Sequence, residues 1–287
     1  MQQKASGRPL AARAAGVLAP TLRYLMQTEV HVFAFSISAG ILLSFFPFMT
    51  LMLSLCRYVF KWKASVNAIN FALGDYFPDV FGQFLRRNLE ATVESRGPVQ
   101  IVSLILLLFT SSGIFEPLEV AFNRAWRCAS NRSYWKNQLL SLGLMFACGG
   151  LILLSITLTA VDNDYLRSST HRAIAPAASL LAYKVAAIPS SMLLLFLMYW
   201  LLLNCKVSAS KLVLPSILVG LLLEGLKYVN LITWPYLRAK LALEYGPFVY
   251  SITIILWGFL AAMLVLAGAD WSARRSRFEP APLASVP

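Results

Sequence analysis

The chain has 287 residues, of which 58% are hydrophobic and 13% are charged, whereas about a quarter of the residues in an average soluble domain are charged. This composition excludes an ordinary soluble protein and indicates an integral membrane protein. The formal net charge of +12 at pH 7 is explained by membrane topology and by attraction to anionic lipid head groups. It therefore does not require a nucleic-acid partner.

The amino-terminal segment, residues 1–31, is basic and rich in alanine, and it offers no long apolar stretch before Pro20. We therefore expect no cleaved signal peptide. The segment is predicted to lie in the cytoplasm or at the membrane surface, with a short interfacial helix that leads into the first span.

Runs of about 20 mostly apolar residues are long enough to cross a bilayer as helices. Six such runs occur in the chain, at Val32–Arg57, Val99–Phe115, Gln138–Val161, Ser179–Leu203, Leu212–Trp234 and Tyr245–Gly268. The predicted fold is therefore an all-α, polytopic membrane protein with six transmembrane helices, in a transmembrane domain of residues 32–270. The tail 271–287 becomes rich in proline and alanine, and we expect it to be a disordered cytoplasmic tail.

An amphipathic helical segment is predicted between spans 1 and 2, after Pro78 and a candidate N-cap at Asp79. Its apolar side gathers Val80, Phe81, Phe84, Leu85 and Leu89, and its polar side gathers Gln83, Arg86, Arg87, Glu90 and Glu94. Two interpretations stay open. The helix lies on the outer membrane boundary in contact with lipid, or it packs on the protein.

An even number of spans places both termini on one side of the membrane. Lysine and arginine concentrate in the termini and in the loops that follow spans 2 and 4, so both termini are predicted to be cytoplasmic. The connector 57–97 conflicts with this orientation because it carries six basic residues on the predicted outer side. We keep the orientation despite this conflict.

The four cysteines, Cys56, Cys128, Cys148 and Cys205, lie singly on different segments without a C-x-x-C spacing. This pattern indicates neither a disulfide framework nor a zinc site. We expect all four to be small packing residues.

The fifth span carries a carboxylate and an amine, Glu224 and Lys227, in an otherwise aliphatic run. Each charge costs roughly 2.5–3.5 kcal/mol near the centre of a membrane helix, so the two need a partner or a function. Their i, i+3 spacing allows them to pair. One interpretation is a structural ion pair that clamps helices together. The other is a polar substrate path between the spans, made by Glu224, Lys227, Tyr228, Lys184, Ser44, Glu119 and Asn123.

A second basic cluster closes the helix of span 2, where Arg124 and Arg127 flank Trp126. Arginine beside tryptophan at a helix end is typical of a membrane anchor. The alternative is a site for an anionic head group, because guanidinium groups match phosphate oxygens with two parallel hydrogen bonds.

The chain contains the stretches SAGILLSFFPFM, SSGIFEPLEVAFNRAWRC and LLLEGLKYVN and, downstream, YGPFVYSITIILWGFLAAMLVLAGADW. Together these stretches resemble the YihY/BrkB family of bacterial inner-membrane proteins. The resemblance covers residues 34–270. It departs from the family pattern at NCKVSAS after span 4 and at Glu116-Pro117. It implies a polytopic inner-membrane protein. One branch of the family is linked to serum resistance and another to export of lipopolysaccharide precursors, and an earlier label as a transfer-RNA ribonuclease was withdrawn.

The chemistry of the sequence disfavours an enzyme. The two histidines, His31 and His171, are far apart, so they do not form a metal-ligand cluster with each other, and the sequence has neither a P-loop nor a G-x-S-x-G elbow. We predict no catalytic residue, no metal and no cofactor. The leading hypothesis is a protein that moves or handles an anionic amphiphile, such as a phospholipid or a lipopolysaccharide precursor, with membrane lipids as its partners. The alternatives are an envelope scaffold that binds other proteins or copies of itself, and a ribonuclease.

Overall fold

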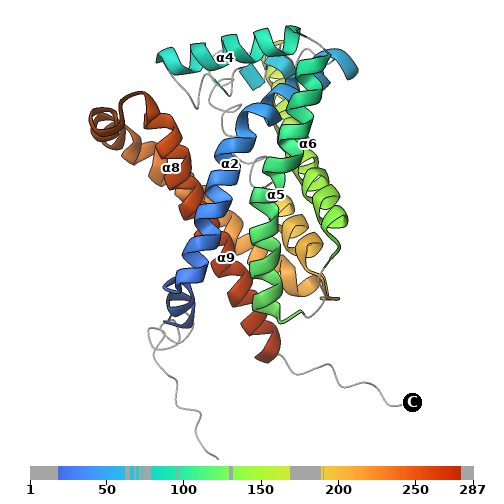
Figure 1. Ribbon diagram of the computed structural model, residues 1–287, viewed down its shortest axis with the longest axis vertical. Coiled ribbons are helices and arrows are strands. Elements are labelled where there is room, and N and C mark those ends of the chain that lie inside the picture. The colour runs from blue at the N-terminus through green and yellow to red at the C-terminus, as the bar shows by residue number, and fades with distance from the viewer. Residues whose placement is uncertain are drawn as a thin grey trace, which may run out of the picture.

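The computed structural model describes residues 19–61, 65–67, 69–70, 73, 79–95, 97–128, 132–168, 189 and 191–278, and in these ranges it is helical with no strand (Figure 1). The elements in chain order are α2 (Thr28–Ser54), a π-helical turn (Leu55–Val59), α4 (Asp79–Glu94), α5 (Pro98–Trp126), α6 (Tyr134–Ser168), an apolar helix at Ser191–Leu202, α8 (Ser210–Tyr245), a 3-10 turn (Gly246–Phe248) and α9 (Val249–Phe278). The all-helical fold is therefore confirmed.

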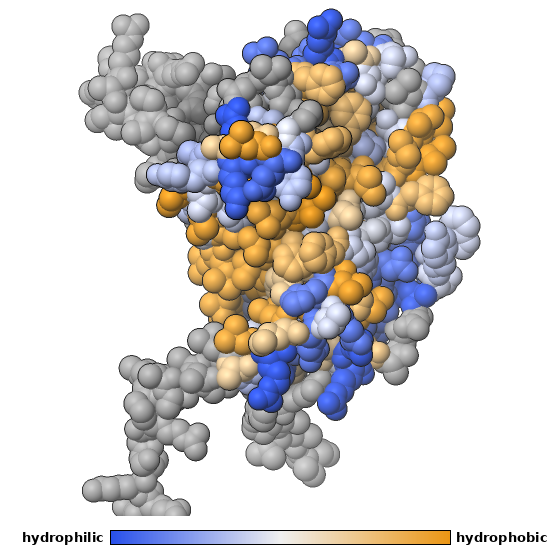
Figure 2. Space-filling view, turned by 60° about the vertical axis from the view of Figure 1, so that its left-hand side comes forward, coloured by the Kyte–Doolittle hydropathy of each residue, from blue (hydrophilic) through white to orange (hydrophobic). Residues whose placement is uncertain are grey.

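Four helical segments in the described part of the chain are long and apolar enough to cross a membrane. They are Thr28–Val59, Ile101–Trp126, Ser210–Asn230 and Val249–Ser276. Figure 2 shows a broad hydrophobic face with hydrophilic residues at both of its ends, as expected for a bilayer-spanning surface. The predicted third span lies within the continuous helix α6. The count of six spans stays a prediction. The first part of the predicted fourth span falls within residues 169–188, which lie outside the described ranges.

Helix α2 packs against both α5 and α9, which also contact each other. The crossing with α5 depends on glycine. A Cβ atom at Gly40 would lie 2.7 Å from the carbonyl carbon of Gly113, so the two backbones touch directly. Close helix approach at small residues is the usual way in which membrane helices gain packing energy.

Helix α4 lies at the opposite end of the bundle from the end of α5 (Figure 1). Its Leu85, Leu89 and Val93 side chains are buried in a cluster with Cys56 of the π-helical turn that follows α2. Phe84, which was predicted on the same apolar side, is exposed. Of the two interpretations, packing on the protein therefore applies to the buried side, and contact with lipid stays a prediction.

Several helices are longer than their predicted spans, because hydrophobicity ends at the membrane boundary whereas the helical hydrogen bonds continue. Helix α5 runs to Trp126 rather than Phe115, and α9 runs to Phe278. The first residues of the segment for which disorder was expected are thus helical. Arg274 even donates a hydrogen bond to the Thr21 hydroxyl at 2.6 Å.

Candidate functional site

A polar pocket of about 210 Å³ lies where the start of α2, the end of α5 and α9 meet. It is lined by Tyr24, Gln27, Glu29, Val30, Phe33, Ala121, Arg124, Ala125, Arg127 and Asp270. The segments that could span a membrane begin at Thr28 on α2 and end at Trp126 on α5. The pocket therefore lies at the boundary between the apolar surface and water.

Charge in this pocket is partly neutralised. Arg124 forms an ion pair with Glu29, with one hydrogen bond to Oε1 at 3.2 Å. Asp270 pairs with Arg274 one helical turn away at 2.6 Å. Within the described ranges, the exposed Arg127 has no carboxylate within ion-pair distance. The pocket therefore keeps one uncompensated guanidinium group.

Arg127 holds an unusual backbone conformation. Its φ angle of 57° is left-handed, and the Cys128 N–H behind it donates to the Asn123 carbonyl at 2.9 Å. Glycine is the common residue at this position of a helix end, because a side chain there costs about 1–2 kcal/mol. Arg127 therefore holds this position at a cost in backbone energy.

Tyr24 adds a neutral donor to the pocket. Burial and then the Asp270 carboxylate raise the pKa of the Tyr24 phenol to about 12, although Arg124 lowers it. Like any tyrosine at neutral pH, Tyr24 is protonated and can donate a hydrogen bond. With Arg127 and the amide of Gln27, the pocket presents donors suited to an anion with several oxygens.

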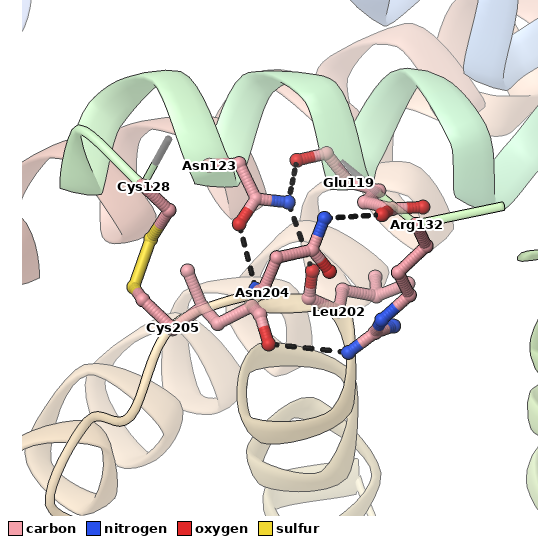
Figure 3. The surroundings of a disulfide bond; sticks show 8 residues. Glu119, Asn123, Cys128, Arg132, Leu202, Asn204 and Cys205 are labelled. Carbon is pink, nitrogen blue, oxygen red and sulfur yellow. Dashed lines mark hydrogen bonds between the residues drawn. A yellow bond between two sulfur atoms is a disulfide. The ribbon is translucent and has the colours of Figure 1, made fainter. Parts of the chain in front are cut away.

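Behind the pocket, Asn123 and Asn204 join α5 to the segment after the helix Ser191–Leu202 (Figure 3). Asn123 is 7% exposed. Its amide donates to the carbonyls of Glu119 at 2.8 Å and Leu202 at 3.1 Å. Its oxygen accepts the Asn204 N–H at 2.7 Å, and the Asn204 amide donates to Glu119 Oε1 at 2.8 Å. The network positions the end of α5.

Glu119 is 5% exposed, and its second carboxylate oxygen is buried without a hydrogen-bond partner in the described part of the chain. Arg132 donates from Nη2 to the Leu203 carbonyl at 3.2 Å. Glu119 and Asn123, predicted for the substrate path, thus lie in the layer that supports the pocket.

The same region holds a feature that the sequence did not predict. Cys128 and Cys205 form a disulfide across 77 residues (Figure 3). The expectation that all four cysteines are packing residues was therefore wrong for this pair. Cys128 and Cys205 follow no spacing motif in the sequence, and the fold alone brings them together. Cys56 is buried and Cys148 is half-buried, as packing residues would be.

The other predicted path residues lie elsewhere. Lys227 and Glu224 pair on α8 at 2.7 Å, with side chains 50% and 14% exposed, and the Ser191 hydroxyl donates to Glu224 at 3.2 Å. The pairing expected from the i, i+3 spacing is present. Ser44 is buried and donates to the Ile41 carbonyl in its own helix at 3.2 Å. Tyr228 is exposed.

No hydrogen bond or ion pair between described residues joins Glu224 or Lys227 to Ser44, Glu119 or Asn123. Lys184 lies outside the described residues. Trp126 is half-buried and packs against the central hydrophobic cluster, so it contributes to the packing of the end of α5.

These features define a class of protein: an all-helical integral membrane protein with a polar pocket at one end of its bundle. A family model described as "Virulence factor BrkB" matches residues 21–284. The chain belongs to this family, and the resemblance inferred from its motifs is confirmed.

Two curated relatives carry the name UPF0761 membrane protein. The one from Laribacter hongkongensis is 24% identical over 93% of this chain and 63% of its own length. The one from Chromohalobacter salexigens is 24% identical over 81% of this chain and 57% of its own length. The chain thus spans about three fifths of the relatives it matches. No solved structure matches it significantly.

Proposed function

We propose that this protein binds and handles an anionic amphiphile, a phospholipid or a lipopolysaccharide precursor, and that the pocket at the end of α5 receives its head group. One observation carries the proposal: within the described ranges, Arg127 is the pocket-lining cation that has no carboxylate partner. A guanidinium group matches a phosphate with two parallel hydrogen bonds.

The position of the pocket supports an amphiphile rather than a water-soluble anion. The pocket adjoins helices that could span a membrane. A ligand with its phosphate at Arg127 can therefore leave its acyl chains against the apolar surface of these helices. Binding a polar head group beside such a surface satisfies both parts of the ligand.

The proposal also covers the protein's partners, its location and its chemistry. Membrane lipids are the partners, the membrane is the bacterial inner membrane with both termini in the cytoplasm, and no catalytic residue, metal or cofactor takes part. The basic residues around Arg127 support this orientation.

The most direct variant is Arg127→Asn, because asparagine tolerates a left-handed backbone and removes only the charged fork. A charge-assisted hydrogen bond is worth about 1.5–3 kcal/mol, so affinity for phosphatidylglycerol should fall about tenfold or more. Affinity for phosphatidylcholine should not change. Lipid titration of the purified protein in nanodiscs measures both.

The matched control is Arg87→Asn on α4, which removes another exposed arginine at the opposite end of the bundle. It should leave the preference for phosphatidylglycerol intact. Equal affinities for the wild-type protein and the Arg127→Asn variant would contradict the assignment of Arg127.

Movement of the amphiphile across the membrane is the further part of the proposal, along a path that contains Glu224, Lys227 and Lys184. Its support is the ion pair within the apolar segment Ser210–Asn230, where ionisable groups often mark a path. Replacing Glu224 and Lys227 together with leucine should slow the transfer of a fluorescent anionic lipid between vesicle leaflets. If transfer stays at the wild-type rate while thermal stability or partner retention changes, the pair is structural and the scaffold alternative holds.

A further inference from the structure

The disulfide between Cys128 and Cys205 joins the segment that follows α5 to the segment that follows the helix Ser191–Leu202, with the two Cα atoms 5.6 Å apart. Both side chains are half-buried. A small reagent can therefore reach this disulfide, which also links two segments of the fold. Cys56 and Cys148 are free, so the chain contains its own unpaired cysteines for comparison.

The disulfide duplicates a connection that hydrogen bonds already make. Asn123 and Asn204 link the same two segments through the bonds shown in Figure 3. Breaking the S–S bond leaves these in place. Reduction is therefore expected to loosen the local backbone and leave the fold intact.

The backbone at Arg127 and Cys128 is the part of the pocket most affected by the state of the disulfide. Cys128 directly follows Arg127, whose left-handed conformation is unfavourable for a residue with a side chain. Such a conformation persists only when its surroundings hold it. A covalent tie at the next residue is one such restraint, so the position of the Arg127 guanidinium depends on the state of the two cysteines.

The basic residues near Cys128 and Cys205 indicate which side of the membrane the pair faces. Arg127, Arg132 and Lys206 surround it in the sequence, and a basic end of this kind faces the cytoplasm. Thiols in that compartment are kept reduced by glutathione and thioredoxin, where disulfides are usually transient. A permanent structural disulfide does not fit this orientation, whereas a reversible one does. The basic side chains would also attract oxidised glutathione, which is anionic.

We propose that Cys128 and Cys205 form a thiol–disulfide exchange site for low-molecular-weight thiols and disulfides of the glutathione type, and that the disulfide state favours binding at the Arg127 pocket. The exchange half stands on the geometry of the cysteine pair and on the cytoplasmic orientation given under the proposed function. The regulatory half rests on the proposed function.

The exchange balances with glutathione as the named reactant. The thiolate of Cys205 attacks one sulfur of oxidised glutathione, whose S–S bond breaks and releases one glutathione. The thiolate of Cys128 then attacks the Cys205 sulfur of the mixed disulfide and releases the second. The two cysteines lose two protons and two electrons, and oxidised glutathione gains them. Reduction is the reverse sequence.

The exchange half is tested by equilibrating the full-length protein in nanodiscs with a series of ratios of reduced to oxidised glutathione, then capping free thiols with a maleimide polymer that shifts mobility in gels. A Cys56→Ser/Cys148→Ser variant leaves only the pair of interest. Two caps should attach under reducing ratios and none under oxidising ratios. Peptide mass spectrometry of the wild-type protein gives the same readout without substitution.

Two outcomes would overturn the exchange site. In the first, the pair stays oxidised at every ratio, which means a permanent structural disulfide that does not exchange with glutathione. In the second, both cysteines accept caps at every ratio, so that no disulfide forms. In the variant that lacks Cys56 and Cys148, adding Cys128→Ser or Cys205→Ser should leave one thiol that is capped under reducing ratios and held as a mixed disulfide with glutathione under oxidising ratios, because its resolving partner is missing.

The regulatory half is tested by titrating phosphatidylglycerol against the oxidised and the reduced wild-type protein. Coupling between two sites commonly changes affinity about fivefold or more, and the oxidised protein should bind more tightly by at least that factor. The Cys128→Ser/Cys205→Ser variant should bind like reduced protein in either buffer. Equal affinities of the two redox states overturn the regulation alone. If neither state prefers phosphatidylglycerol over phosphatidylcholine, the proposed function fails while the gel assay still decides the exchange site.

Discussion

Replacing Asn123 with alanine is expected to lower the free energy of unfolding by about 2–4 kcal/mol, because the change leaves buried partners unsatisfied at about 1–3 kcal/mol each. The Asn204 N–H loses its acceptor, and the Leu202 carbonyl loses a donor from a side chain that is almost fully buried. Unfolding in mixed detergent micelles, followed by circular dichroism, measures the change.

Asn88→Ala is the matched control, since the Asn88 amide donates to the Phe84 carbonyl in its own helix at 2.7 Å in an exposed position. Water can replace that bond, so the loss should stay within about 0.5 kcal/mol. If the two variants are equally stable, the hydrogen bonds between α5 and the following segment do not stabilise the end of α5, and the support of the pocket has been assigned to the wrong residues.

Gly40→Ala should also destabilise the protein, by about 1–3 kcal/mol, which is the usual penalty for overpacking a close contact. The added Cβ would lie 2.7 Å from the Gly113 carbonyl carbon and 2.8 Å from its oxygen. Both are backbone atoms, which cannot turn aside as a flexible side chain can. The helices α2 and α5 must therefore move apart, which a fall in the melting temperature in detergent would record.

Gly143→Ala and Gly225→Ala serve as controls, because a Cβ at either position meets nothing within 4 Å. Alanine is favoured over glycine inside a helix by about 0.5–1 kcal/mol, so these variants should be as stable as the wild-type protein or slightly more stable. A similar loss in all three variants would show that the Gly40 crossing is not specially tight.

The elements that follow from local pattern were predictable. Helix α4 covers Asp79–Glu94, within the amphipathic helical segment that was expected after Pro78. The pairing of Glu224 with Lys227 follows from their spacing on one helix. In both places the determining residues are close in the sequence, so periodicity alone contains the information.

The site could not be predicted in the same way, because its contacts join distant segments. The ion pair of Arg124 with Glu29 spans 95 residues, and the disulfide spans 77. Neither has a local signature. Asn123 and Arg124 lie in a stretch that carries the family resemblance. The left-handed backbone at Arg127, however, belongs to the hydrogen-bonded end of α5.

Cross-linking with an anionic lipid that carries a photoactivatable diazirine in its head group tests the central proposal most directly. The wild-type protein in nanodiscs should be labelled on the peptides that contain Tyr24, Glu29 and Arg127. Labelling there should fall in the Arg127→Asn variant and should be weak for a zwitterionic analogue. Labelling spread evenly around the bundle, or equal for the two lipids, would contradict a head-group site at the end of α5.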